Sequence, residues 1–233
     1  MRIDKYLANM GVGTRKEVKD YISKGFILIN GEVVKKATQQ INENEDKIEY
    51  KNQEIIYKPY IYLMLNKPQG VISATKDYSK TVIDLLEEKY QNKDIFPVGR
   101  LDKDTEGFLL LTNDGKLAHE LLSPKKKVNK KYFARVEKGL KKEDIQVFEN
   151  GVYLDKENYL TKPAKLEILS DNEAYITIQE GKYHQVKRMF HAVDNSVIYL
   201  KRISMGELSL DENLKLGEYR ELTDEEINLL KGE

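Results

Sequence analysis

The segment from Gly99 to Gly115, GRLDKDTEGFLLLTNDG, constrains the fold more than any other part of the chain. Its apolar run from Phe108 to Thr112 is too short for a typical helix and lies between glycines and acidic turn-forming residues. Such a run is typical of a short buried strand. Four carboxylates and two basic residues surround it, namely Asp102, Asp104, Glu106, Asp114, Arg100 and Lys103. The segment therefore raises the question of what chemistry needs a carboxylate beside a strand.

Length and composition exclude several classes of protein. A chain of 233 residues with 40% hydrophobic content can form one large domain or two modest ones. No apolar run approaches the ~20 residues that cross a bilayer, and charges interrupt the N-terminal MRIDKYLANMG where a signal peptide would be apolar. We expect a cytoplasmic protein without membrane contacts. The absence of cysteine excludes disulfides, thiolate catalysis and sulfur-ligated zinc.

The formal net charge of zero conceals an uneven distribution. The segment from Pro124 to Lys142 carries nine basic residues and one acid, whereas Glu207 to Glu233 carries three basic residues and nine acids. The basic segment can serve a polyanionic partner, or it can be a solvated loop. The charges alone leave both interpretations open.

The first 35 residues predict two short helices and a hairpin. Thr14 and Glu17 have capping-box spacing, Gly25 closes the helix that they begin, and Asn30-Gly31 marks a two-residue hairpin turn. Up to Gln40 the segment carries four acids and eight basic residues that can face phosphates: Arg2, Lys5, Arg15, Lys16, Lys19, Lys24, Lys35 and Lys36. The polar segment from Asn42 to Lys58 contains short strand-like pieces and then resembles a linker.

A second unit begins near Tyr60. IYLMLNKPQGVISAT predicts a strand, a turn at Pro68 to Gly70, and a second strand. Thr81 to Tyr90 predicts a helix with Val82, Leu85 and Leu86 facing inward. Because strands and helices mix without a repeated βαβ period, we expect an α+β domain with a mixed, mainly antiparallel sheet.

A metal site is one alternative explanation of the acids. Asp102, Asp104, Glu106 and Gly107 match the start of a calcium loop, yet the twelfth position from Asp102 is Asn113, where that loop needs a bidentate Glu. No recognisable ligand set for a two-metal hydrolase is present in the sequence. We expect no metal and no cofactor. Asp102 can also be a structural turn residue that accepts backbone hydrogen bonds.

Several motifs resemble known families. MRIDKYLANMGVGTRKEVKDYISKGFILINGEVV resembles the S4 RNA-binding domain. GRLDKDTEGFLLLTNDG resembles the principal motif of the pseudouridine synthases, KKYFARVEKG their second motif and EGKYHQVKRMF their third. With LNKPQGVISAT and the terminal GEYRELTDEEI, the resemblance covers nearly all of the chain and is most similar to the RsuA type, which modifies small-subunit ribosomal RNA.

This resemblance implies a role for each site residue. Asp102 is the catalytic carboxylate, which attacks the base or ribose, or stabilises positive character at C1′. Tyr132 is the stacking platform for the flipped base and a candidate base for the C5 proton, although a structural strand tyrosine is the simpler alternative. Lys187 is the cation paired with Asp102, and Val186 packs near Tyr132. Arg100 fills the gap that the flipped base leaves, or contacts phosphate.

The third motif predicts a helix from Tyr183 to Val193. Its core face comprises Val186, Met189, Phe190 and Val193, and its basic face comprises His184, Lys187, Arg188 and His191. The two histidines can indicate a metal pair, but without a third ligand we interpret them as polar surface or RNA contacts. Gln185 and Arg188 of this motif are further candidates for RNA contact or support of the site.

The sequence thus predicts two domains, an S4-like RNA-binding domain over 1–59 and a catalytic domain over 60–233. The predicted reaction is the isomerisation of one uridine to pseudouridine. The resemblance to the small-subunit type implies that the target is uridine 516 of 16S ribosomal RNA. We expect a monomer that acts on the RNA or on a small-subunit assembly intermediate. A 23S ribosomal RNA synthase of the same architecture is the nearest rival. A non-catalytic RNA-binding or ribosome-assembly protein is the rival from another class.

Overall fold

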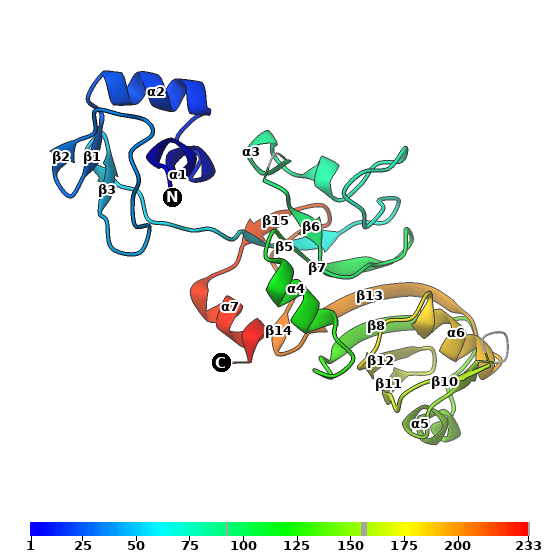
Figure 1. The fold of residues 1–233 in the computed structure, drawn as a ribbon. Helices are drawn as coiled ribbons and strands as arrows, with labels where there is room; N and C mark the ends of the chain where they lie inside the picture. Colours follow the sequence, from blue (N-terminus) through cyan, green and yellow to red (C-terminus); the bar gives the residue numbers. More distant parts are fainter. Residues whose placement is uncertain (92, 155–157, 233) are drawn as a thin grey trace. The chain divides into compact units, whose positions relative to one another are not determined.

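The computed structural model describes residues 1–91, 93–154 and 158–232 (Figure 1). The chain divides into one unit from Met1 to Tyr60 and a second from Ile61 to Glu233. Within the described residues, the longest helices are too short and too polar to cross a membrane.

The first unit consists of two helices and a small antiparallel sheet with the order β2-β1-β3-β4. The elements are α1 (Ile3–Asn9), α2 (Arg15–Ser23), β1 (Ile27–Ile29), β2 (Glu32–Val33), β3 (Ile48–Tyr50) and β4 (Gln53–Glu54). The predicted capping box is present, because the Thr14 side chain accepts from the Glu17 N–H and the Glu17 carboxylate accepts from the Thr14 N–H. Asn30 and Gly31 both have positive φ, as the predicted hairpin turn requires.

The strand-like pieces predicted between Asn42 and Lys58 are strands of this sheet. β3 pairs with β1 and also with β4, so the strand-like pieces after Asn42 belong to the unit rather than lying outside it. Ile48 packs into a core with Ile3, Leu7 and Ile27. The basic residues proposed to face phosphate lie on the outside, with Lys5, Arg15 and Lys16 all exposed.

The second unit is built on a nine-stranded sheet. Seven strands follow the order β11-β12-β8-β13-β7-β5-β15, while β14 pairs with β13 and β6 with β7. The strands are β5 (Tyr62–Lys67), β6 (Phe96–Pro97), β7 (Glu106–Thr112), β8 (Lys130–Val136), β11 (Lys165–Ser170), β12 (Glu173–Ile178), β13 (Val197–Met205), β14 (Leu208–Ser209) and β15 (Tyr219–Glu221). β7 and β13 pair in parallel and the other pairs of this sheet that the structure describes are antiparallel, which confirms the predicted mixed sheet.

Two hydrophobic clusters lie on opposite faces of β7. Leu109 and Leu111 belong to one cluster, whereas the alternating Phe108 and Leu110 belong to the other. Helices α5 (Lys142–Glu149) and α6 (Gln185–Ala192) contribute to the first cluster, and α4 (Gly115–Leu122) and α7 (Asp224–Lys231) to the second. The remaining elements are η1 (Ile83–Leu85), α3 (Glu88–Gln91) and a small hairpin of β9 (Tyr153–Leu154) and β10 (Tyr159–Leu160).

The helix predicted over Thr81 to Tyr90 is wrong as a single element. It is divided into η1 and α3 because Leu86 is extended, with ψ of 151°. Leu86 is nevertheless buried, as predicted, along with Val82. The strand predicted after Gly70 is reduced to an isolated bridge between Ile72 and Thr81.

We predict that Gly107→Ala destabilises the second unit severely. Gly107 has φ of +101°, and a Cβ there would lie 2.2 Å from the carbonyl oxygen of Arg202 in the neighbouring strand. Both the strain and the clash act on a central strand, so we expect a loss of at least about 2 kcal/mol in denaturant unfolding followed by circular dichroism. Gly115→Ala is the matched control, because Gly115 has open space around its Cβ position and begins α4. Equal stability of the two variants would contradict this account.

Candidate active site

The loop that carries Asp102 is held in place by a buried lysine. Lys67, at the end of β5, is 0% exposed. Its ammonium donates to the carbonyl oxygens of Pro68 at 3.0 Å, Asp102 at 3.0 Å and Thr105 at 2.9 Å. The Thr105 N–H also donates to the Asp102 carbonyl, at 3.0 Å. These bonds fix the backbone on both sides of the Asp102 side chain.

Burial has a strong effect on the protonation of Lys67. Desolvation lowers its pKa to about 8, although the nearby carboxylates of Asp102, Asp104 and Glu106 oppose this shift. The three carbonyl oxygens match the three N–H donors of an ammonium. The buried ammonium therefore uses all three of its donors to hold the backbone carbonyls of Pro68, Asp102 and Thr105 in place.

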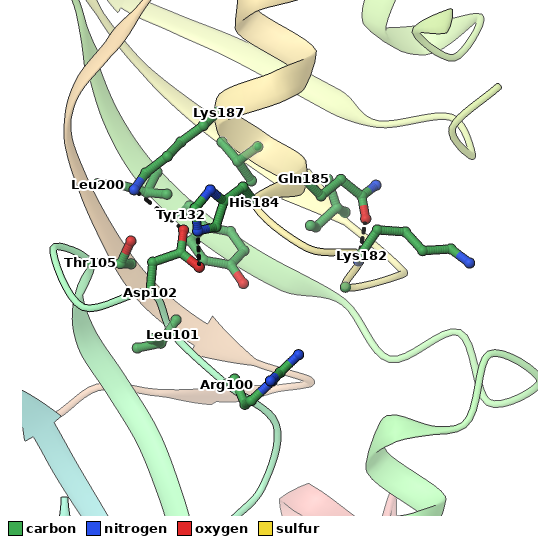
Figure 2. A pocket seen from close by; sticks show the side chains of 13 residues that line it. Arg100, Leu101, Asp102, Thr105, Tyr132, Lys182, His184, Gln185, Lys187 and Leu200 are labelled. Atoms are coloured by element: carbon green, nitrogen blue, oxygen red, sulfur yellow. Dashed lines mark hydrogen bonds and ion pairs between the residues drawn. The ribbon is translucent and has the colours of Figure 1, made fainter. Parts of the chain in front are cut away.

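The Asp102 carboxylate faces two basic side chains from the third motif. Its Oδ2 lies 3.3 Å from Nζ of Lys187, and its Oδ1 lies 3.4 Å from Nε2 of His184 (Figure 2). The side chain of Asp102 is 24% exposed. The structure thus brings together Asp102 and Lys187, which lie 85 residues apart in the sequence.

Lys187 is shared between two carboxylates. Its Nζ donates to Oδ1 of Asp104 at 2.5 Å, a shorter distance than to Asp102. Partial burial of Asp104 would raise its pKa, but the hydrogen bond and charge of Lys187 outweigh that effect and the pKa is lowered. Asp104 is therefore a second acidic partner of Lys187, which the sequence motifs did not predict.

The helix of the third motif is shorter than predicted, and this changes the place of His184. α6 begins at Gln185, and His184 before it is left-handed with φ of 48°. The predicted core face is present, since Val186, Met189 and Phe190 are buried. His184 does not lie on the helical basic face as expected. Its ring stacks on Tyr183, with centroids 3.8 Å apart.

Tyr132 forms part of the wall of a cleft next to Asp102. It lies on β8 and is 7% exposed. The cleft, about 400 Å³ including its open mouth, has an apolar wall made by Tyr132, Val186, Leu200 and Ile178. Its polar wall includes Arg100, Asp102, Lys182, His184 and Lys187 (Figure 2). One cleft therefore combines a carboxylate, cations and an aromatic ring.

The other predicted site residues differ in where they lie. Arg100 is exposed at the cleft, and Gln185 is buried in its wall, where Nε2 donates to Glu180 at 2.6 Å. Arg188 lies on α6 and is not among the residues that line the cleft. The predicted RNA contacts Lys5, Arg15 and Lys16 belong to the first unit. Among the residues that the structure describes, no three acids or histidines converge as metal ligands.

Comparisons with known proteins identify the family. The family model described as RNA pseudouridylate synthase matches residues 61–192, and that of the S4 domain matches residues 1–46. The chain belongs to the RNA pseudouridylate synthases. The uncharacterized RNA pseudouridine synthase YtzG of Bacillus subtilis is 52% identical over 99% of this chain and 98% of its own length.

Two further relatives support this assignment. The ribosomal small subunit pseudouridine synthase A of Vibrio cholerae is 40% identical to this synthase, over 97% of this chain and 98% of its own. A crystal structure of a pseudouridylate synthase is 39% identical, covers 99% of both chains and gives a TM-score of 0.71. The predicted enzyme class and the S4 domain are therefore confirmed.

Besides Asp104, sequence reasoning missed Lys67, Leu200 and Thr105, each of which shapes the candidate active site. Lys67 lies in the quoted LNKPQG motif, but a lysine beside a turn gives no sign that it is buried. Leu200 lies on β13, and its pattern of alternation predicts burial but not a cleft. Thr105 lies within the principal motif, but the motif resemblance implied no role for its hydroxyl.

We predict that Lys67 makes the stability of the synthase depend on pH. The folded state holds this lysine with a pKa of about 8, against the ordinary lysine pKa of 10.5 that applies to an unfolded chain. Above pH 8 the unfolded state therefore binds more protons, so stability should rise with pH between about 8 and 10.5. In urea unfolding, wild type relative to Lys67→Met should gain on the order of 1–3 kcal/mol across this range. A constant difference would show that the lysine is not desolvated.

Proposed function

We propose that this synthase isomerises a single uridine of small-subunit ribosomal RNA, with Asp102 as the nucleophile. The observation that carries this proposal is the placement of the Asp102 carboxylate in a cleft, 3.3 Å from Lys187, with Tyr132 in the wall. Relatives that are about 40% identical over the whole chain are named for the ribosomal small subunit. Both the chemistry of the site and this family likeness support the assignment.

The reaction needs no external oxidant. The N1–C1′ bond of uridine breaks, the uracil rotates, a C5–C1′ bond forms, and the proton on C5 leaves. Asp102 attacks the base or ribose, or stabilises positive character at C1′, and the ammonium of Lys187 lies 3.3 Å from its carboxylate. Tyr132 lines the same cleft as Asp102. Its ring supports the rotating base, and its hydroxyl is the candidate base for the C5 proton.

The RNA contacts proposed for this synthase come from two regions. Lys5, Arg15 and Lys16 are exposed on the S4 domain, which we assign to residues 1–59, and they provide sequence-independent phosphate contacts. Arg100 and Lys182 are exposed at the cleft of the catalytic domain, which we assign to residues 60–233. We propose that the protein acts as a monomer on ribosomal RNA in the cytoplasm.

Mapping pseudouridines in both ribosomal RNAs tests the target. Cells with and without the gene should differ at one position, which we propose is uridine 516 of 16S ribosomal RNA. Loss of a site in 23S ribosomal RNA would favour the large-subunit rival. Unchanged maps would favour a role in RNA binding or ribosome assembly without catalysis.

We predict that Asp102→Asn abolishes turnover and leaves RNA binding nearly intact. The amide keeps the shape of the side chain but removes the negative charge, so turnover should fall by at least about 10³-fold. Affinity for RNA should be equal or slightly higher, because one charge that repels phosphate is gone. RNA carrying tritium at C5 of uridine releases label to water on every completed reaction, which measures chemistry separately from binding.

Glu106→Gln is the matched control for this change. Glu106 comes from the same motif, but its Oε2 accepts from the Tyr199 hydroxyl at 2.7 Å, and Glu106 does not line the cleft. The control should release tritium at close to the wild-type rate. Wild-type turnover by Asp102→Asn would mean that the nucleophile has been assigned to the wrong residue.

A further inference from the structure

Thr105 carries a hydroxyl whose hydrogen bonding is incomplete. The residue is 1% exposed, and its Oγ1 has no hydrogen-bond partner among the described residues. It lies in the wall of the active-site cleft. A buried hydroxyl without a partner lowers stability, so such a group calls for an explanation.

The other buried serine and threonine hydroxyls of the described chain do have partners. Ser73 donates to the carbonyl of Leu101 at 2.9 Å, and Thr81 donates to Asp84 at 2.9 Å. The remaining two, Thr112 and Thr161, accept from backbone N–H groups at 3.0 and 2.9 Å. Thr105 is therefore the exception among the buried serines and threonines that the structure describes.

The backbone around Thr105 cannot easily move to find a partner. Its N–H is bonded to the carbonyl of Asp102 and its own carbonyl to the ammonium of Lys67. The bonds that position Asp102 therefore also position the Thr105 hydroxyl. Figure 2 shows this hydroxyl beside the Asp102 carboxylate, on the side away from the Tyr132 ring in that view.

We propose that the Thr105 hydroxyl binds the 2′-hydroxyl of the ribose at the target nucleotide. This inference rests on the proposed function, in which C1′ comes to Asp102 and the base lies against Tyr132. The 2′-hydroxyl is attached to the carbon next to C1′, so in this arrangement it comes close to Asp102, and Thr105 lines the same cleft. A ribose hydroxyl both donates and accepts, which gives Thr105 the partner that the RNA-free chain lacks.

This contact would make Thr105 a specificity residue for RNA. The 2′-hydroxyl is the group by which a protein distinguishes ribonucleotides from deoxyribonucleotides at a given position. In wild type, replacing the target uridine by 2′-deoxyuridine should weaken binding roughly threefold to tenfold, the range for one neutral hydrogen bond. Thr105→Val keeps the shape of the side chain, and its affinity for the uridine RNA should fall by the same factor.

The experiment compares two RNAs on three full-length proteins. Synthetic 16S fragments centred on uridine 516 carry uridine or 2′-deoxyuridine at that position, and Asp102→Asn is the background so that turnover does not change the RNA. Thr105→Val should bind the two RNAs with equal affinity, whereas Thr105→Ser, which retains a hydroxyl, should still prefer the uridine RNA. The melting temperature of RNA-free Thr105→Val should be no lower than that of its parent.

Three outcomes would overturn the proposal. The first is that Thr105→Val lowers the affinity for both RNAs equally, and the second is that this variant still prefers the uridine RNA as strongly as its parent. The third is a lowered melting temperature of the RNA-free variant, which would reveal an internal partner of the hydroxyl. These outcomes are separate from failure of the proposed function. That failure would appear as tritium release by Asp102→Asn, or as ribosomal RNA maps that the gene does not alter.

Discussion

The close approach of β7 to β13 at Gly107 determines the geometry of the candidate active site. Arg202 of β13 pairs with Gly107 on one side and with Tyr132 of β8 on the other. Two inter-strand spacings, roughly 10 Å, therefore separate the start of β7 from Tyr132. Asp102 lies in the loop just before β7, so the sheet itself sets the gap between the carboxylate and the aromatic ring. A side chain at position 107 would widen that gap, because its Cβ would meet the backbone of Arg202.

Lys67 at the end of β5 fixes the backbone of the loop that carries Asp102. Surface loops are ordinarily mobile, but three carbonyl oxygens bonded to one buried ammonium restrict this one. Desolvation of the ammonium costs free energy, as its lowered pKa shows. The benefit is a fixed direction for Asp102 and for the Thr105 hydroxyl. Preorganised polar groups of this kind need little rearrangement during a reaction.

The sequence predicted those features that depend on local patterns. The cap at Thr14, the turn at Asn30-Gly31 and the core face of α6 follow from residue type and spacing, and each is present. The motif resemblance placed Asp102 and Lys187 together, which no local pattern could do. Local patterns failed where tertiary contacts decide the backbone. His184 takes a left-handed conformation before α6, and Leu86 is extended so that its side chain reaches the core.

Lys187 is shared between two carboxylates that differ in exposure to solvent. The side chain of Asp104 is 69% exposed, whereas that of Asp102 is 24% exposed. Ion pairs on exposed carboxylates are screened by water and salt and contribute little, while those in enclosed sites are stronger. When RNA covers the cleft and excludes water around Asp102, the attraction between Asp102 and Lys187 increases. We therefore expect RNA binding to favour the contact of Lys187 with Asp102 over its contact with the more exposed Asp104.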